Sequence, residues 1–214
     1  MKESFFFIDL DGTLIDSKYR VYKLFIDLTK SSISFEDYWK IKETGKTNHD
    51  VLNHLQVNAD AELPTFNKEW FKLIEARTYL SIDVLLPKSM EALEKLAQFG
   101  KLILVTSRQS KENTHWQLQE LGVSRFFHDI IVTEHKKVKP LALADWIQVN
   151  KDGISHSSFM IGDTEEDLQA SVQNNLKAIG VLTGFRSEAF LKELAFSGYY
   201  DSLYHFSKSI SLIM

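Results

Sequence analysis

The chain has 214 residues, enough for one domain or for a core domain that carries a smaller insert. Hydrophobic residues make up 44% of the sequence and charged residues 25%, which excludes an intrinsically disordered tail. The formal net charge of −4 excludes a generally basic nucleic-acid-binding protein, and the absence of cysteine excludes disulfides, thiolate metal sites and a cysteine nucleophile.

The N-terminal apolar run, residues 5–8, is far shorter than a signal-peptide core or a membrane span, and acidic residues follow it directly. We therefore expect a soluble cytoplasmic protein with neither a membrane nor a nucleic acid as partner. The sequence does not indicate the oligomeric state.

Five short apolar runs have the length expected of strands whose two faces are both covered by helices. They are residues 5–8, 102–105, 130–132, 159–161 and 178–181. Apolar residues at helical spacing lie between these runs, for example Met90, Leu93 and Ala97. This alternation predicts an α/β fold with a Rossmann-like, doubly wound parallel sheet.

The stretch from residue 16 to residue 86 breaks the alternation. Apolar stripes around Leu24 and Trp70 have helical spacing, and no convincing strand separates them. We predict an α-helical cap, residues 16–86, inserted into an α/β core formed by residues 1–15 and 87–214. The two segments in which the chain passes between core and cap would then act as a hinge. Ligands of open α/β sheets bind beyond the carboxyl ends of the strands, so the loops there should carry the chemistry.

Two acidic clusters follow predicted strands. Asp9 and Asp11 come directly after the first strand, where a cation or a proton must offset their charges, and carboxylates favour a hard cation such as Mg²⁺. Asp163 follows the fourth run and could complete the ligand set, while Asp167 could hold a metal-bound water. The alternative interpretations are an ordinary Asp-Gly turn and simple helix capping.

Phosphate-binding groups are predicted after the second and third runs. The Thr106 hydroxyl and free backbone N–H groups around Ser107 could hold phosphate oxygens, although both residues are also ordinary helix caps. Lys139, fixed before Pro140, could place a positive charge between the acids and a phosphoryl group. Arg108 either steers an anion or lies in solvent.

The four segments around Asp9, Thr106, Lys139 and Asp163, in this order along the chain, resemble the motifs of the haloacid dehalogenase (HAD) superfamily, in particular its phosphoglycolate phosphatase-like members with a helical cap. Residues 7–17 match the first motif fully, and residues 162–167 match the fourth. Two departures are the continuation of Lys139-Pro140 as Leu141-Ala142-Leu143, where the family usually has Lys-Pro-x-Pro, and Asn174-Asn175 in place of a usual Ala-Gly turn. Because asparagine tolerates a positive φ, we expect the same turn here.

The resemblance implies an enzyme, a Mg²⁺-dependent phosphatase that hydrolyses a small phosphorylated metabolite through an aspartyl-phosphate. Asp9 would be the nucleophile and Asp11 the general acid and base. The metal would be bound by Asp9, the backbone carbonyl of Asp11 and Asp163, with Asp167 acting through water. The phosphate-binding groups would be Thr106, Ser107 and Lys139.

Two other functions stay open at this stage, a β-phosphoglucomutase-like phosphosugar mutase and a non-catalytic binding protein with the same fold. The cap would set the substrate. Lys46, beside Gly45 in a break between two helical stretches, is either a ligand for a second anionic group of the substrate or part of an exposed connector.

Overall fold

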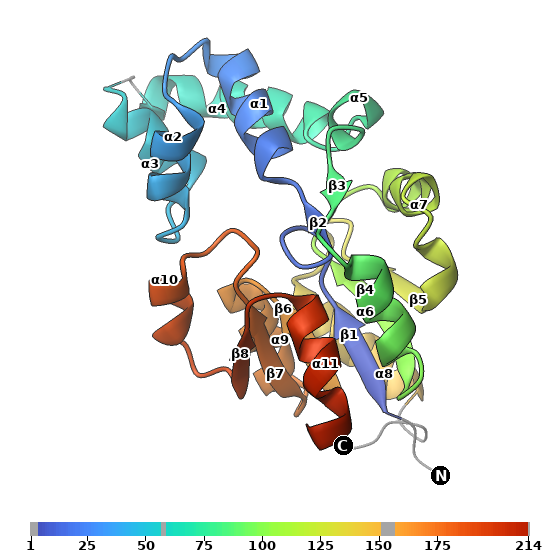
Figure 1. The fold of residues 1–214 in the computed structure, drawn as a ribbon. Coiled ribbons are helices and arrows are strands. Elements are labelled where there is room, and N and C mark those ends of the chain that lie inside the picture. Colours follow the sequence, from blue (N-terminus) through green and yellow to red (C-terminus); the bar gives the residue numbers. More distant parts are fainter. Residues whose placement is uncertain (1–3, 57–58, 151–156, 214) are drawn as a thin grey trace.

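The computed structural model describes residues 4–56, 59–150 and 157–213. Six strands form a parallel sheet in the order β5-β4-β1-β6-β7-β8 (Figure 1). They are β1 (Phe5–Ile8), β4 (Lys101–Thr106), β5 (Phe127–Val132), β6 (Phe159–Gly162), β7 (Lys177–Val181) and β8 (Gly198–Tyr200). The five apolar runs form the first five of these strands, which confirms the predicted doubly wound α/β class.

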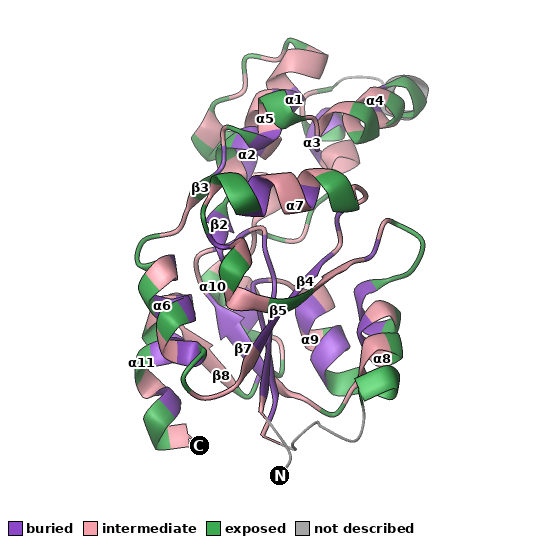
Figure 2. Cartoon of the chain, turned by 90° about the vertical axis from the view of Figure 1, so that its right-hand side faces the viewer, coloured by how far each residue is buried: buried purple, intermediate pink, exposed green. Residues whose placement is uncertain are grey.

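Helices cover both faces of the sheet. On one face lie α6 (Ser89–Leu96), α7 (Lys111–Glu120) and α11 (Leu203–Ile213), and on the other lie α8 (Lys139–Asn150) and α9 (Glu165–Gln173). Strand β1 serves both layers, because Phe6 and Ile8 point into the first and Phe5 and Phe7 into the second. The central strands are accordingly buried on both sides (Figure 2). Two short helices, η1 (Ser124–Phe126) and α10 (Glu188–Lys192), complete this layer structure.

The order of the strands fixes the place of the site. Strand β1 pairs with β4 on one side and with β6 on the other. The chain therefore builds the sheet in one direction from β1 to β4 and β5, and then returns past β1 to add β6, β7 and β8 on the other side. At such a switch point the loops after neighbouring strands separate and leave a crevice at the carboxyl ends. Asp9, Thr106 and Asp163 occupy the ends of these strands: Thr106 is the last residue of β4, and Asp9 and Asp163 directly follow β1 and β6.

Five helices form a separate layer beyond the carboxyl ends of the strands (Figure 1). They are α1 (Lys18–Thr29), α2 (Phe35–Lys42), α3 (Asn48–His54), α4 (Ala59–Leu73) and α5 (Arg77–Leu80), and we call them the cap. They have an aromatic core of their own that includes Phe25, Tyr38 and Phe66. The division into a cap of residues 16–86 and a core of residues 1–15 and 87–214 stays a prediction.

Two short strands connect the cap to the core. The chain enters the cap through β2 (Ile15–Asp16) and returns through β3 (Val84–Leu85), and the two strands pair antiparallel. A two-residue ladder has few hydrogen bonds, although Ile15 and Leu85 also pack into the α/β core, and a hinge at this connection stays a prediction. Among the described residues, no helix is long and apolar enough to cross a membrane.

The cap contacts the core along two seams. On one seam the ring of Trp39 stacks on Phe185 with 5.4 Å between centroids, and the Ser187 N–H donates to the carbonyl of Glu43 at 3.0 Å. On the other seam the Glu75 carboxylate accepts hydrogen bonds from the backbone N–H groups that open α7. The space between the two seams is the crevice that β1 faces.

Candidate active site

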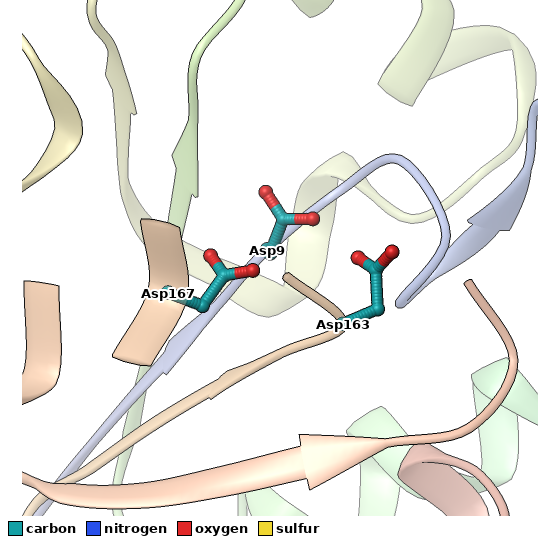
Figure 3. Close-up of side chains that lie close together, drawn as sticks. All are labelled: Asp9, Asp163 and Asp167. Atoms are coloured by element: carbon teal, nitrogen blue, oxygen red, sulfur yellow. The ribbon is translucent and has the colours of Figure 1, made fainter. Parts of the chain in front are cut away.

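Three buried carboxylates meet at the carboxyl ends of β1 and β6. Asp9, Asp163 and Asp167 offer oxygen atoms that all lie within 4.8 Å of one another, and the three side chains point toward a common space (Figure 3). Their exposed fractions are 5%, 0% and 0%. Three carboxylates cannot all stay ionised in a buried site unless cations offset their charges.

Glycines make the space for Asp163. A Cβ atom built on Gly184 would lie 1.9 Å from Oδ2 of Asp163, and one built on Gly12, which has a φ of +87°, would lie 2.6 Å from it. A side chain at either position would therefore displace the carboxylate. Asp163 itself is held by two donors, the Thr13 hydroxyl at 3.2 Å and the Phe185 N–H at 2.7 Å.

Lys139 supplies the one positive charge in direct contact with this cluster among the described residues. Its Nζ atom donates to Asp9 Oδ1 at 2.7 Å and to Asp167 Oδ1 at 2.6 Å, and the residue is 2% exposed. Burial alone would lower the pKa of Lys139, but the charges of Asp167 and Asp9 raise it, so the lysine stays charged. Lys139 thus lies against two of the predicted acids, and its contact with a phosphoryl group stays a prediction.

One lysine does not neutralise three carboxylates. Burial raises the pKa of Asp9 well above its usual value, and burial together with the charge of Asp167 raises the pKa of Asp163 to about 7. Both shifts mean that the cluster binds protons when no other cation is present. A divalent cation would take their place, and carboxylate oxygens are the ligands that Mg²⁺ prefers. The donor set therefore fits the expected metal.

Asp167 has a structural role as well. Its Oδ2 atom accepts from the N–H and the hydroxyl of Thr164, at 3.0 and 2.8 Å, which closes a capping box at the start of α9. Both oxygens of Asp167 therefore already have donors, one from Lys139 and one from Thr164. A role through water, as the resemblance implies, would use the remaining lone pairs.

Two arginines hold Asp11. Arg108 donates from Nε to Asp11 Oδ2 at 2.8 Å and from Nη2 to Oδ1 at 2.9 Å, and Arg20 of the cap forms an ion pair with Oδ1. Burial would raise the pKa of Asp11, but the charges of Arg108 and Arg20 outweigh it and hold the pKa far below the usual range. Asp11 is therefore a carboxylate in this arrangement.

Both arginines belong to a buried network that joins the cap to the core. Arg20 donates to both oxygens of Asp83 at 2.9 Å, and Arg108 also donates to Gln117 at 2.6 Å. Arg108 is 4% exposed, so it does not lie in solvent, and it lines the crevice; the steering of an anion by Arg108 stays a prediction. Arg20 could not be singled out from the sequence, because a charged residue inside an amphipathic helical stripe is usually solvated.

The other predicted residues lie at different places. Thr106 and Ser107 line the crevice beside Asp9, and the Ser107 hydroxyl donates to Glu166 at 2.8 Å. Lys46 does not line the crevice; it is exposed in the loop between α2 and α3. His135, which the sequence grouped with a solvated charge run, is on the rim of the crevice against the ring of Phe71.

The fold and the site together define a class of protein, a capped α/β protein with a buried carboxylate cluster at its switch point. The family model described as "haloacid dehalogenase-like hydrolase" matches residues 6–181. The chain belongs to this family of hydrolases, as the sequence motifs predicted.

Individual relatives are distant in sequence. The chain is 24% identical over 189 residues to pyrophosphatase PpaX of Oceanobacillus iheyensis, and the match covers 86% of each chain. Among solved structures, a haloacid dehalogenase-like hydrolase, SP0104, from Streptococcus pneumoniae has a TM-score of 0.75 at 17% identity, over 100% of this chain and 99% of that one. A candidate phosphoglycolate phosphatase from Lactobacillus plantarum has a TM-score of 0.72 at 17% identity, with full coverage of both chains. These structures share the fold.

Proposed function

We propose that the protein is a Mg²⁺-dependent phosphatase that hydrolyses a small phosphorylated metabolite through an aspartyl-phosphate on Asp9. The observation that carries this proposal is the position of Asp9, at the switch point of the sheet, with Lys139 on one of its oxygens and Asp163 beside it. A carboxylate can attack phosphorus there because its surroundings offset the charge of the incoming phosphoryl group.

In the first half of the reaction, an oxygen of Asp9 forms a bond to phosphorus while the bond from phosphorus to the substrate oxygen breaks. Lys139, the Thr106 hydroxyl and the Ser107 N–H would hold the phosphoryl oxygens. Asp9, Asp163 and the backbone carbonyl of Asp11 would hold Mg²⁺, which when bound offsets the negative charge of the phosphoryl group.

In the second half, a water attacks phosphorus and releases phosphate and the free Asp9 carboxylate. Asp11 is suited to accept the proton of this water because its two arginines keep it ionised. Donating a proton to the leaving alcohol in the first half is a different task. For that, the Asp11 carboxylate must first leave Arg20 and Arg108 and take up a proton from water, which it then passes to the leaving alkoxide. The proton that Asp11 accepts from the attacking water in the second half serves the next turnover. Because Arg20 belongs to the cap, we propose that cap movement and proton donation are linked.

The comparisons support this chemistry at the level of the family, and the relative PpaX is named as a pyrophosphatase. Four of the six groups expected of a phosphatase, Asp9, Asp11, Thr106 and Lys139, line one crevice. The other two, Asp163 and Asp167, cluster with Asp9, and this convergence favours an enzyme over a binding protein. We expect the protein to act on its substrate in the cytoplasm.

The test is phosphate release from a panel of phosphorylated metabolites with purified protein and MgCl₂. EDTA and the Asp9→Asn variant should each abolish turnover, because nucleophile and cation act as a unit. The matched control is Asp16→Asn, an exposed carboxylate of the same motif, which should keep wild-type turnover. Wild-type phosphate release by Asp9→Asn would overturn the covalent mechanism.

A further inference from the structure

The crevice between cap and core has a volume of about 260 Å³. Asp9, Asp11, Thr106 and Lys139 form its floor at the ends of the strands. A phosphoryl group on Asp9 would occupy the floor, so the leaving group of the substrate must occupy the part that faces the cap. The side chains of that wall therefore select the leaving group.

The cap side of the crevice is aromatic and apolar, and we call these side chains the wall. Trp70, Phe71 and Ile74 contribute to it from the end of α4 and the residue that follows, and Phe185 contributes from the loop after β7. Trp70 is held in place by stacking on Phe66 at 5.4 Å between centroids. Aromatic side chains bind a ring in stacked or edge-to-face contact, and each such pair adds to the gain from burying the ring.

The described lining of the crevice has no spare lysine or arginine for a second anionic group. Lys139 is bound to Asp9 and Asp167, and Arg108 is bound to Asp11 and Gln117. The other lining residues include two more carboxylates, so four acids stand against two cations. A bound divalent cation would bring this balance to about zero, which leaves nothing to offset a further negative charge.

The two additional acids are Glu75 and Glu166. Glu75 accepts from the N–H groups of Gln109 and Ser110, both at 2.8 Å, and Glu166 accepts from the Ser107 hydroxyl. These hydrogen bonds hold both carboxylates in place at the wall. They would repel the carboxylate of a phosphorylated acid or the second phosphate of pyrophosphate.

The size of the crevice limits the leaving group further. An apolar cavity of about 150 Å³ is enough for one benzene ring. A crevice of about 260 Å³ therefore has room for a phosphoryl group and one ring beside it.

We infer that the substrate is a phosphomonoester whose alcohol carries one aromatic or heteroaromatic ring and no second anionic group. This inference rests on the proposed function and names the substrate class of the same site. It differs from the sequence-based hypothesis that Lys46 binds a second anion, because Lys46 does not line the crevice and both cationic side chains that do, Arg108 and Lys139, are already paired with carboxylates.

The first test compares kcat/KM for four substrates at fixed MgCl₂: benzyl phosphate, propyl phosphate, phosphoglycolate and pyrophosphate. Benzyl and propyl phosphate both release a primary alcohol of similar leaving ability, so the ratio of their kcat/KM values reports on binding of the ring. We expect benzyl phosphate to exceed propyl phosphate by about tenfold, through a lower KM, and to exceed both doubly anionic substrates.

The second test changes the wall. Phe71→Ala should raise KM for benzyl phosphate by about fivefold and change KM for propyl phosphate by less than about twofold. Phe71 is 48% exposed, so its removal should spare folding. Tyr19→Ala is the matched control, because Tyr19 is an aromatic residue of the cap with 54% exposure that does not line the crevice. It should leave both values unchanged.

Titration calorimetry with benzylphosphonate, propylphosphonate and phosphonoacetate, none of which can be hydrolysed at the ester position, separates the two proposals. Tighter binding of benzylphosphonate supports the inference whatever the mechanism. Preference for phosphonoacetate, for phosphoglycolate or for pyrophosphate would overturn it and leave the phosphatase proposal standing, as would an equal effect of Phe71→Ala on both esters. Metal-independent turnover, or turnover by Asp9→Asn, would instead overturn the proposed function.

Discussion

Lys139 offers the sharpest test of how the carboxylate cluster is held together. Its ammonium group contacts Asp9 and Asp167 at 2.7 and 2.6 Å in a site with almost no solvent exposure. Lys139→Met keeps the length of the side chain and removes the charge. Three buried carboxylates are then left with no cation in contact with them, apart from any bound metal.

The expected cost follows from these contacts. Removing one partner of a buried ion pair typically destabilises a protein by about 3–5 kcal/mol, because the remaining charges stay buried without compensation. For a chain of this length, that corresponds to a fall in Tm of roughly 6–20 °C. Part of the cost should be recovered by MgCl₂, since a divalent cation can offset the same carboxylates.

Urea unfolding of wild type and Lys139→Met, each with EDTA and with MgCl₂, measures both quantities. The matched control is Lys137→Met, an exposed lysine two positions earlier that pairs with Asp145 at the surface, and its effect should stay within about 1 kcal/mol. A Lys139→Met protein as stable as the wild type in EDTA would refute the view that this lysine compensates the cluster.

Three further predictions concern the rest of the site. Arg20→Met should lower the free energy of unfolding by about 3 kcal/mol and reduce kcat more than it raises KM, because Asp83 keeps only Arg108, at 3.5 Å, as a charged partner and Asp11 loses its ion pair with the cap; unchanged urea unfolding would contradict this. Magnesium should raise Tm more at pH 8 than at pH 6, because the pKa of Asp163 is raised to about 7 and protons compete with the metal below that pH. In the metal-free protein, the same raised pKa stabilises the folded state most below pH 4, and this contribution is lost as the pH rises through 7. Equal gains in Tm at both pH values would contradict the prediction. Glu75→Gln should weaken the contact between cap and α7 and cost about 1–2 kcal/mol, whereas an unchanged Tm in a thermal melt would show that this contact does not stabilise the cap.

Much of the core could be predicted because its strands are buried on both faces. A continuous apolar run of the length of residues 102–105 is typical of a strand between two helical layers. The turn after α9 was also predictable, and Asn175 adopts a φ of 55° there. Strand β8 could not be predicted, because Gly198–Tyr200 is a short edge strand with only half-buried residues and no apolar run.

The helical stripes were less informative about which side chains face the core. Val172 is an apolar residue of α9, yet it is 64% exposed. A single apolar residue on a short helix does not fix the orientation of that helix, because the packing of the neighbouring α8 decides it. The existence of the helix could be predicted from the sequence, and its buried face only in part.

The residues of the site also differ in how far the sequence predicts their positions. Asp9, Asp163 and Lys139 could be placed together because each comes at or after the carboxyl end of a strand, and parallel strands bring these ends to one edge. Arg20 contacts Asp83, which is 63 positions away in the sequence, and Asp11, which is 9 positions away. No local sequence pattern indicates either contact. In the wall of the crevice, the sequence indicated Trp70 only as part of a helical stripe and did not indicate Phe71.

The proposed mechanism depends above all on phosphorylation of Asp9 during turnover. It can be detected by rapid acid quench of the protein with MgCl₂ and benzyl phosphate or another turned-over substrate, followed by borohydride reduction and mass spectrometry of the peptide that contains Asp9. Reduction of an acyl phosphate converts that aspartate to homoserine. We expect homoserine at position 9 in wild type and none in Lys139→Met with EDTA; an unmodified Asp9 throughout steady turnover would show that the enzyme does not use this intermediate.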